Sequence, residues 1–246
     1  MSEQHPDISV IVTLYNYAHY IKDTVNSFIK QDYTNAEMII IDDASRDNPL
    51  SVLSPILEKD NRIKYIRLDN NLGYSAAKNY GIKNAKSDVL VMLDADDMLT
   101  SNSLTKRFEK LKQGYDLVHG PVLDLRDKKT SESKLWKQWI KSKKDASCYR
   151  FIHAQSVMLK KEIHRIIGLY DESMRSKSDR EMWARVLNHK FKVGWVDEYV
   201  AVYRMHPNQM HRSKEKLKVN DKLQKDLLLK ISRRKKDLSD IVLLTG

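Results

Sequence analysis

The sequence predicts an α/β fold in which a mainly parallel sheet is flanked by helices. Over the first hundred or so residues, short runs rich in Ile and Val alternate with segments of helical periodicity. Strands separated by helices in this way are typical of βαβ units. Polar or acidic residues directly follow three of the four runs. The chain has 246 residues, 41% hydrophobic and 31% charged, so it can bury a core without disulfides.

The four strands of the first half are expected to be buried on both faces, because each is an almost continuous apolar run. They are Ile8–Leu14, Glu37–Ile41, Ile63–Leu68 and Val89–Leu93. Helical spacing of apolar residues predicts the helices between them, over 19–31, 50–59 and 74–86. A helix between each pair of strands favours parallel pairing in this half.

The second half is predicted to be a smaller, mixed region. We expect helices over 104–112 and 179–189, strands at Tyr115–Pro121 and 154–160, and a hairpin of Val193–Val196 with Tyr199–Tyr203. From residue 213 onward, leucines recur at a spacing compatible with an amphipathic helix that carries a lysine face.

Several protein classes are disfavoured by sequence features. Cys148 is the single cysteine, so no internal disulfide can form. The chain has no run of about 18 apolar residues that could span a membrane, and its N-terminus lacks the pattern of a secretion signal. Neither G-x-G-x-x-G after the first strand nor G-x-x-x-x-G-K-[ST] occurs, which disfavours a dinucleotide-binding Rossmann domain and a P-loop NTPase. We therefore expect a cytoplasmic protein.

The net charge of +11 is concentrated in two segments. Residues 126–150 hold nine basic and three acidic side chains, and residues 212–236 hold eleven and three. Such segments attract an anionic partner, which could be a membrane surface, a nucleic acid or a phosphorylated substrate. The alternative interpretation is two solvated, lysine-rich helices.

The acidic residues Asp94, Asp96 and Asp97 follow a buried strand within four positions. Carboxylates this close repel one another and raise one another's pKa, a penalty that a divalent cation removes. Oxygen ligands favour Mg²⁺ or Mn²⁺, and Mg²⁺ commonly binds protein carboxylates together with substrate phosphates. The alternative is a solvated loop in which an Asp caps the next helix.

Two further residues follow predicted strands and could contact a nucleotide base. Asp43 comes after the second strand and could accept a hydrogen bond from a base N–H. Tyr15 comes after the first strand and could stack on a base, although ordinary packing is the better explanation of this residue taken by itself.

Six motifs succeed one another across residues 8–211. They are ISVIVTLYNYAHYIKDTVNSFIKQDY, IIIDDAS, NLGYSAAKNYGI, VLVMLDADDML, GLYDESMRSKSDREMWARV and VYRMHPNQM. They resemble, in order, parts of the family 2 glycosyltransferases, which have the GT-A fold. These parts are the first strand and helix, the second-strand motif, the N-x-G-x-x-x-A-[R/K]-N-x-G segment, the D-x-D strand end, the E-D-x-E-L-W stretch and the Y-R-x-H motif.

The resemblance implies a nucleotide pocket formed by residues of the first half. Thr13, Tyr15 and Asp43 would hold the base and the ribose. Gly73 and Lys78 would border the pocket, and Lys78 could meet a phosphate. The donor is then a nucleoside diphosphate sugar, with UDP as the nucleotide that this family most often uses and GDP and dTDP as the alternatives.

The resemblance also implies a metal site and a general base. Asp94 would contact the ribose or the water shell of the metal, and Asp96 would bind the Mn²⁺ or Mg²⁺ that bridges the donor diphosphate. His206 would be a further metal or phosphate contact. Asp179 would deprotonate the acceptor hydroxyl, which implies inversion by a single displacement.

The chain departs from the family pattern at two positions. The acidic pair before the helix is Ser178-Asp179, so the base has lost an acidic neighbour and should be a slightly weaker base. Position 78 holds Lys where Arg is common, so a bidentate phosphate contact becomes a point charge.

The resemblance divides the chain into a glycosyltransferase domain, residues 1–211, and a basic helical C-terminal extension, residues 212–246. Within the domain, residues 1–100 would form the half that binds the nucleotide sugar, and residues 101–211 the half that binds the acceptor and catalyses transfer.

The sequence leaves three classes of acceptor or role open. A saccharide or lipid-linked glycan is the commonest acceptor of the family, and residues 212–236 would then make a peripheral membrane contact. DNA with a hydroxylated base is the alternative, with Trp136 and Trp139 stacking on bases and the basic segments neutralising phosphates. A non-catalytic protein that binds a nucleotide sugar or scaffolds a complex is the third, against which the retained Asp96 and Asp179 argue.

Overall fold

The computed structural model describes residues 5–126, 128–132, 152–174, 177–207 and 209. Its helices are α1 (Ala18–Ile29), α2 (Pro49–Leu57), α3 (Tyr74–Asn84), α4 (Ser103–Leu111), α6 (Glu162–Ile167) and α7 (Ser178–Asn188), with a 3-10 turn η2 (Ala154–Ser156). Its strands are β1 (Ile8–Leu14), β2 (Ala36–Asp42), β3 (Ile63–Arg67), β4 (Val89–Asp94), β5 (Met98–Leu99), β6 (Leu117–His119), β7 (Val122–Arg126), β8 (Lys129–Glu132), β9 (Met158–Lys160), β10 (Val193–Trp195) and β11 (Ala201–Arg204).

Several predictions concern residues outside this description. Trp136, Trp139, Cys148 and most of the basic segment 126–150 lie there, as does the whole extension 212–246. The amphipathic helix expected from residue 213 onward therefore stays a prediction.

The central sheet confirms the predicted α/β class. Its strand order is β10-β6-β9-β4-β1-β2-β3, and β4, β1, β2 and β3 pair in parallel along the chain segments predicted for them. Strand β9 runs antiparallel to both β4 and β6. The carboxyl ends of β4, β1 and β2 consequently meet at one edge, where open α/β sheets bind their ligands.

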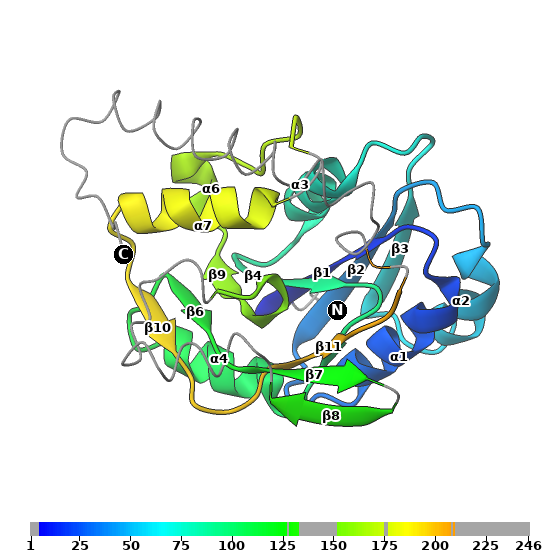
Figure 1. Cartoon of the computed structure of the whole chain (residues 1–246), viewed down its shortest axis with the longest axis horizontal. Helices are drawn as coiled ribbons and strands as arrows, with labels where there is room; N and C mark the ends of the chain where they lie inside the picture. The colour runs from blue at the N-terminus through cyan, green and yellow to red at the C-terminus, as the bar shows by residue number, and fades with distance from the viewer. Residues whose placement is uncertain (1–4, 127, 133–151, 175–176, 208, 210–246) are drawn as a thin grey trace.

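Helices cover both faces of this sheet (Figure 1). Val10 and Val12 of β1 face one core together with residues of α1, α2 and α4. Ile11, between them, faces a second core formed with α3, α6 and α7. Successive strand residues point to opposite faces, so an uninterrupted apolar strand has to be covered on both sides.

A second, four-stranded sheet has the order β5-β11-β7-β8 and contains parallel and antiparallel pairs. The predicted hairpin of Val193–Val196 with Tyr199–Tyr203 is wrong. Strand β10 pairs in parallel with β6, and β11 pairs in parallel with β7, so the two segments belong to different sheets. The chain passes between the sheets at Gly120, where a Cβ would lie 2.6 Å from a methyl group of Val196.

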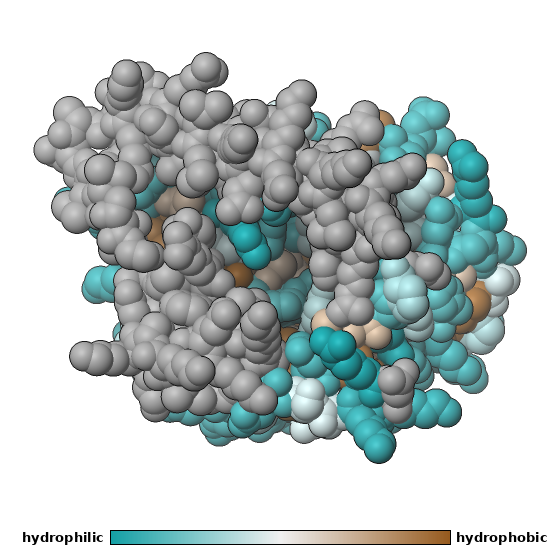
Figure 2. Space-filling model, viewed as in Figure 1, coloured by the Kyte–Doolittle hydropathy of each residue, from teal (hydrophilic) through white to brown (hydrophobic). Residues whose placement is uncertain are grey.

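The described helices are too short or too polar to cross a lipid bilayer. On the face shown in Figure 2, the described side chains are mainly hydrophilic, with small apolar areas between them.

Candidate active site

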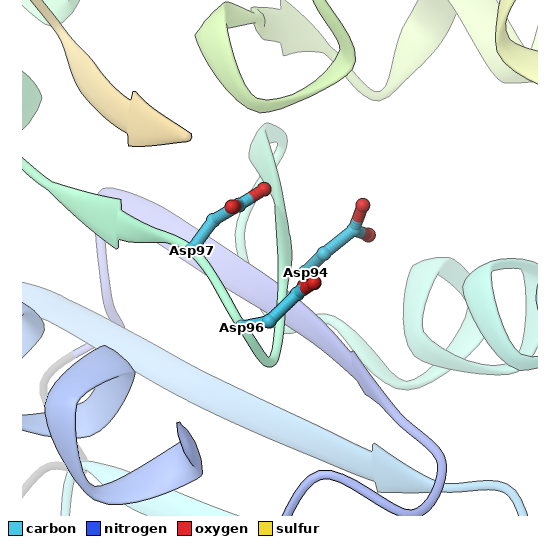
Figure 3. A group of neighbouring side chains, drawn as sticks. All are labelled: Asp94, Asp96 and Asp97. Atoms are coloured by element: carbon cyan, nitrogen blue, oxygen red, sulfur yellow. The ribbon is translucent and has the colours of Figure 1, made fainter. Parts of the chain in front are cut away.

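Three carboxylates gather at the end of β4. Asp94 is the last residue of that strand, and Asp96 and Asp97 lie in the turn that leads to β5. One oxygen from each lies within 4.8 Å of the others. Figure 3 shows Asp94 and Asp97 extending to the same side of the turn, with the Asp96 carboxylate between them.

Asp94 is held by donors from three different elements. The hydroxyl of Thr13 on β1 donates to its Oδ1 at 3.1 Å. The Tyr74 hydroxyl on α3 donates to the same oxygen at 2.9 Å and lies 3.2 Å from Oδ2. The Gln155 amide on η2 donates to Oδ2. Thr13 and Asp94 were both predicted for this site, whereas Tyr74 and Gln155 were not.

His206, the histidine of the Y-R-x-H motif, lies against Asp96. Its Nε2 is 3.0 Å from Asp96 Oδ2, and its ring packs on those of Tyr17 and Tyr20. Burial and the neighbouring Asp94 raise the pKa of Asp96 to about 6. The charged form of the Asp96 carboxylate is therefore destabilised, and a bound cation would stabilise it.

Asp97 is fully buried and only half satisfied. Its Oδ1 accepts a hydrogen bond from the backbone N–H of Arg204 at 2.9 Å. Its Oδ2 has no hydrogen-bond partner in the described part of the chain. Burial and the charges of Asp96 and Asp94 raise the pKa of Asp97 well above its usual range.

The cluster fits a divalent cation of the Mn²⁺ or Mg²⁺ type. Its ligands are all carboxylate oxygens, which hard cations prefer. Asp97 Oδ2 is a buried oxygen without a donor in the described residues. Burial first, and repulsion between the carboxylates second, raise the pKa values of Asp96 and Asp97, and a bound cation would counter both effects.

Asp43 holds the loop that precedes α3. Its two oxygens accept hydrogen bonds from the backbone N–H groups of Leu72, at 2.7 Å, and Gly73, at 2.8 Å. Gly73 has φ of +93°, which favours glycine, and a Cβ there would meet only open space. Each carboxylate oxygen keeps a second acceptor site for a ligand. Tyr15, just beyond β1, is 40% exposed.

Lys78 places a buried ammonium group beside the cluster. The residue is 1% exposed, and its Nζ lies 4.0 Å from the ring centre of Tyr74 and 5.0 Å from that of Tyr170. Nζ has no hydrogen-bond partner among the residues described. Burial lowers the pKa of Lys78, an effect that the charges of Asp94 and Asp179 oppose.

Asp179 lies in the first turn of α7 and is half-buried. Its charge acts together with that of Asp94 on the pKa values of Tyr74, Lys78 and His153. The predicted base and the predicted D-x-D carboxylate therefore border the same region. Ser178, which replaces the expected acidic neighbour, is fully buried.

The structure thus brings Thr13, Asp94, Asp96 and His206 together, and ties Asp43 to Gly73. Sequence reasoning missed Tyr74, Gln155 and Arg204 as residues of the site. Tyr74 and Arg204 lie inside two of the recognised motifs, so a search of each motif for further donors would have found them. Gln155 lies outside all six motifs and carries no signal in the sequence.

This sheet edge, with its carboxylate cluster, is the arrangement of a GT-A glycosyltransferase. The family model "Glycosyl transferase family 2" matches residues 9–168. The chain belongs to that family.

Relatives and solved structures agree with this assignment. The chain is 34% identical over 116 residues to an uncharacterized glycosyltransferase of Haemophilus influenzae, covering 47% of this chain and 46% of that protein. It is 29% identical over 226 residues to TuaG of Bacillus subtilis, a glycosyltransferase provisionally assigned to teichuronic acid biosynthesis, covering 88% and 86%. The match with the Haemophilus protein thus spans about half of that relative's length.

Two solved glycosyltransferases share the fold at low sequence identity. TarS of S. aureus, residues 1–349 in complex with UDP-GlcNAc, aligns with a TM-score of 0.69 at 19% identity, covering 84% of this chain and 61% of that one. The mannosyltransferase PcManGT of Pyrobaculum calidifontis, in complex with GDP-Man and Mn²⁺, aligns with a TM-score of 0.69 at 18% identity, covering 84% and 59%.

Proposed function

We propose that the protein is an inverting glycosyltransferase that moves a sugar from a nucleoside diphosphate sugar, with UDP as the nucleotide, to an acceptor hydroxyl. The observation that carries this proposal is the carboxylate cluster at the sheet edge, which Asp179 borders from α7. Residues 1–100 supply the nucleotide-binding half, and residues 101–211 supply the acceptor side and the base.

The nucleotide would lie across the carboxyl ends of β1 and β2. Asp43 has acceptor sites left for a base N–H, and the exposed ring of Tyr15 can stack on the base. Thr13 would hold the ribose, and Gly73 leaves the backbone open to close approach. Lys78 would offer a phosphate its three N–H groups, which have no acceptor among the residues that the structure describes.

Asp96 and His206 would hold the metal, and Asp94 would contact the ribose or the metal's water shell. Asp97, with its unpartnered oxygen, is a further ligand candidate. When bound, a Mn²⁺ or Mg²⁺ ion stabilises negative charge on the departing diphosphate.

Asp179 would take the proton of the acceptor hydroxyl. The acceptor oxygen forms a bond to the anomeric carbon while the bond from that carbon to the diphosphate oxygen breaks. The electron pair leaves with the nucleoside diphosphate, and attack from the opposite face inverts the anomeric configuration. The carboxylate of Asp179 serves as a general base, a role worth about 10²- to 10⁴-fold in rate.

For the acceptor we propose a saccharide or lipid-linked glycan, with residues 212–236 in peripheral contact with a membrane. The support is the family resemblance and the similarity to TuaG along most of both chains. DNA with a hydroxylated base is the second candidate, because the basic segments 126–150 and 212–236 and the pair Trp136 and Trp139 suit phosphates and bases.

The test begins with donor turnover. UDP-, GDP- and dTDP-sugars are offered with Mn²⁺, and nucleoside diphosphate release is measured with lipid-linked saccharides or with hydroxymethylated duplex DNA as acceptor. The Asp179→Asn variant should bind UDP and Mn²⁺ as the wild type does and lose transfer. Near-normal transfer by this variant would remove Asp179 as the base, and release stimulated only by DNA would select the second candidate.

A further inference from the structure

Gln155 connects the carboxylate cluster to the second sheet. It lies on the 3-10 turn η2 just before β9, and its side chain is 4% exposed. Its Nε2 donates to Asp94 Oδ2. The turn itself contacts β4 of the central sheet and β11 of the second sheet. Gln155 therefore reaches Asp94 from the half of the chain to which the acceptor side is assigned.

A buried arginine fixes this turn. Arg107 of α4 is fully buried, and its Nη1 donates to the carbonyl oxygens of Ser156 and Val157, both at 3.1 Å. Its Nε and Nη2 bind the carbonyl and hydroxyl of Ser103. The groups that it binds in the described residues are all neutral, and burial lowers the pKa of Arg107 to about 9. Burying a charged guanidinium group against neutral partners costs free energy. This cost indicates that the position of the turn serves the site as well as the packing of α4.

The Gln155 amide is only half satisfied. Its Oε1 is buried and accepts no hydrogen bond of good geometry in the described residues, although the amide interacts with the His153 imidazole. Burial lowers the pKa of His153, and this interaction with Gln155 opposes the effect. Gln31 offers a contrast elsewhere in the fold. The Gln31 Nε2 donates to the carbonyls of Ser27 and Thr100, and its Oε1 accepts from the N–H of Leu104. An amide kept for stability has both ends bonded, as Gln31 does.

We propose that Gln155 is a positioning residue of the active site, which orients the Asp94 carboxylate for the metal–nucleotide complex while Arg107 holds its turn in place. The proposal rests on the proposed function, in which Asp94 faces the ribose or the metal's water shell. Thr13 donates to Oδ1 of Asp94, and Tyr74 donates to Oδ1 at 2.9 Å and to Oδ2 at the longer distance of 3.2 Å. Gln155 donates to Oδ2 only, so among the described residues it is the donor that distinguishes Oδ2 from Oδ1.

The test compares Gln155→Met with the matched control Gln31→Met in the full-length protein. Mn²⁺ affinity is measured by electron paramagnetic resonance in the presence of saturating UDP, and Tm is measured without ligands. Losing a residue that orients a metal-site carboxylate weakens metal affinity by about 10- to 100-fold. Because Gln155→Met also removes an unpartnered buried oxygen, its Tm should stay within about 2 °C of the wild type. Gln31→Met should lower the Tm and leave the Mn²⁺ affinity unchanged.

The outcomes distinguish a role of Gln155 in orienting Asp94 from a purely structural role. Wild-type Mn²⁺ affinity in Gln155→Met overturns the proposal, as does a loss of affinity that merely accompanies a fall in Tm like that of Gln31→Met. Gln155→Asn keeps the amide group but shortens the side chain by one methylene, so it should also weaken Mn²⁺ binding. This variant provides a second test if Gln155→Met fails to fold. A wild-type protein that binds no Mn²⁺ with UDP, GDP or dTDP would overturn the proposed function, and this inference with it.

Discussion

Asp96 is expected to destabilise the metal-free protein, so that Asp96→Asn should stabilise it. Burial and the charge of Asp94 raise the pKa of Asp96 to about 6. A carboxyl group whose pKa is higher in the folded state than in the unfolded state holds its proton more tightly when folded. The folded state therefore loses stability as pH rises from about 4 to about 6, and the loss is complete above that range. Asparagine carries no such penalty.

The expected gain follows from the size of the shift. A pKa raised from 3.8 to about 6 corresponds to about 3 kcal/mol at pH 8, and about half of that has developed at pH 5. The Asp96→Asn variant also weakens the contact with His206, and this loss offsets about 1 kcal/mol of the gain in stability. A net gain of about 2 kcal/mol at pH 8 raises the Tm of a chain of this size by about 4–8 °C. At pH 5 the gain should be less than half as large.

Thermal unfolding at pH 5 and pH 8, with and without Mn²⁺, measures this effect. Added Mn²⁺ should raise the Tm of the wild type and leave that of Asp96→Asn unchanged. Asp60→Asn is a control of opposite sign, because hydrogen bonds from Arg62 lower the pKa of Asp60. Asp60 therefore contributes stability above its unfolded pKa, and its loss should lower the Tm more at pH 8 than at acidic pH. A metal-free Asp96→Asn protein that is less stable than the wild type at pH 8 would refute the reasoning.

Three further predictions concern the ligands. Asp43→Ala should weaken UDP binding by about 10-fold or more in calorimetry, because it removes a charged acceptor and releases the loop that ends at Gly73. An unchanged affinity would show that the uracil base binds elsewhere. Lys78→Met should weaken the binding of UDP but not of uridine, and should raise the Tm because it removes a buried charge; equal losses for both ligands would exclude a phosphate contact. Deleting residues 212–246 should reduce binding to anionic vesicles and spare UDP binding, and a folded truncation that loses UDP would assign the extension to the active site.

The first half of the fold was predictable because its signals are local. Each buried strand is an apolar run, and a run such as Val89–Leu93 ends where the acidic residues begin. The parallel order follows once helices separate the strands. The second half depends on contacts between distant segments. Gly120 allows β6 and β7 to pass from one sheet to the other beside β10 and β11. Nothing in the alternation of Val193–Val196 and Tyr199–Tyr203 distinguishes that crossing from a hairpin.

The same distinction separates the site residues that were found from those that were missed. Asp94 and Asp96 follow a strand, so their position is visible in the sequence. Gln155 reaches Asp94 across 61 positions of the chain, and the turn that carries it is held by Arg107, which would be expected on an exposed helix face. A buried guanidinium bound to backbone carbonyls leaves no pattern in the sequence, since its partners are carbonyls that every residue possesses.

The electrostatics of the site explain why a metal and a diphosphate should bind together. Among the residues described, Asp97 Oδ2 is a buried carboxylate oxygen without a hydrogen-bond donor, and Lys78 Nζ is a buried amino group without an acceptor. Tyr74 contacts both Asp94 and Lys78, because its hydroxyl donates to Asp94 and its ring lies 4.0 Å from Lys78 Nζ. The charges of Asp94 and Asp179 act on Lys78, but no oxygen of the described residues accepts a hydrogen bond from its Nζ. A divalent cation alone would satisfy the carboxylates, and a phosphate alone would satisfy Lys78. Since a metal–diphosphate complex supplies both at once, Mn²⁺ and UDP should each raise the affinity for the other.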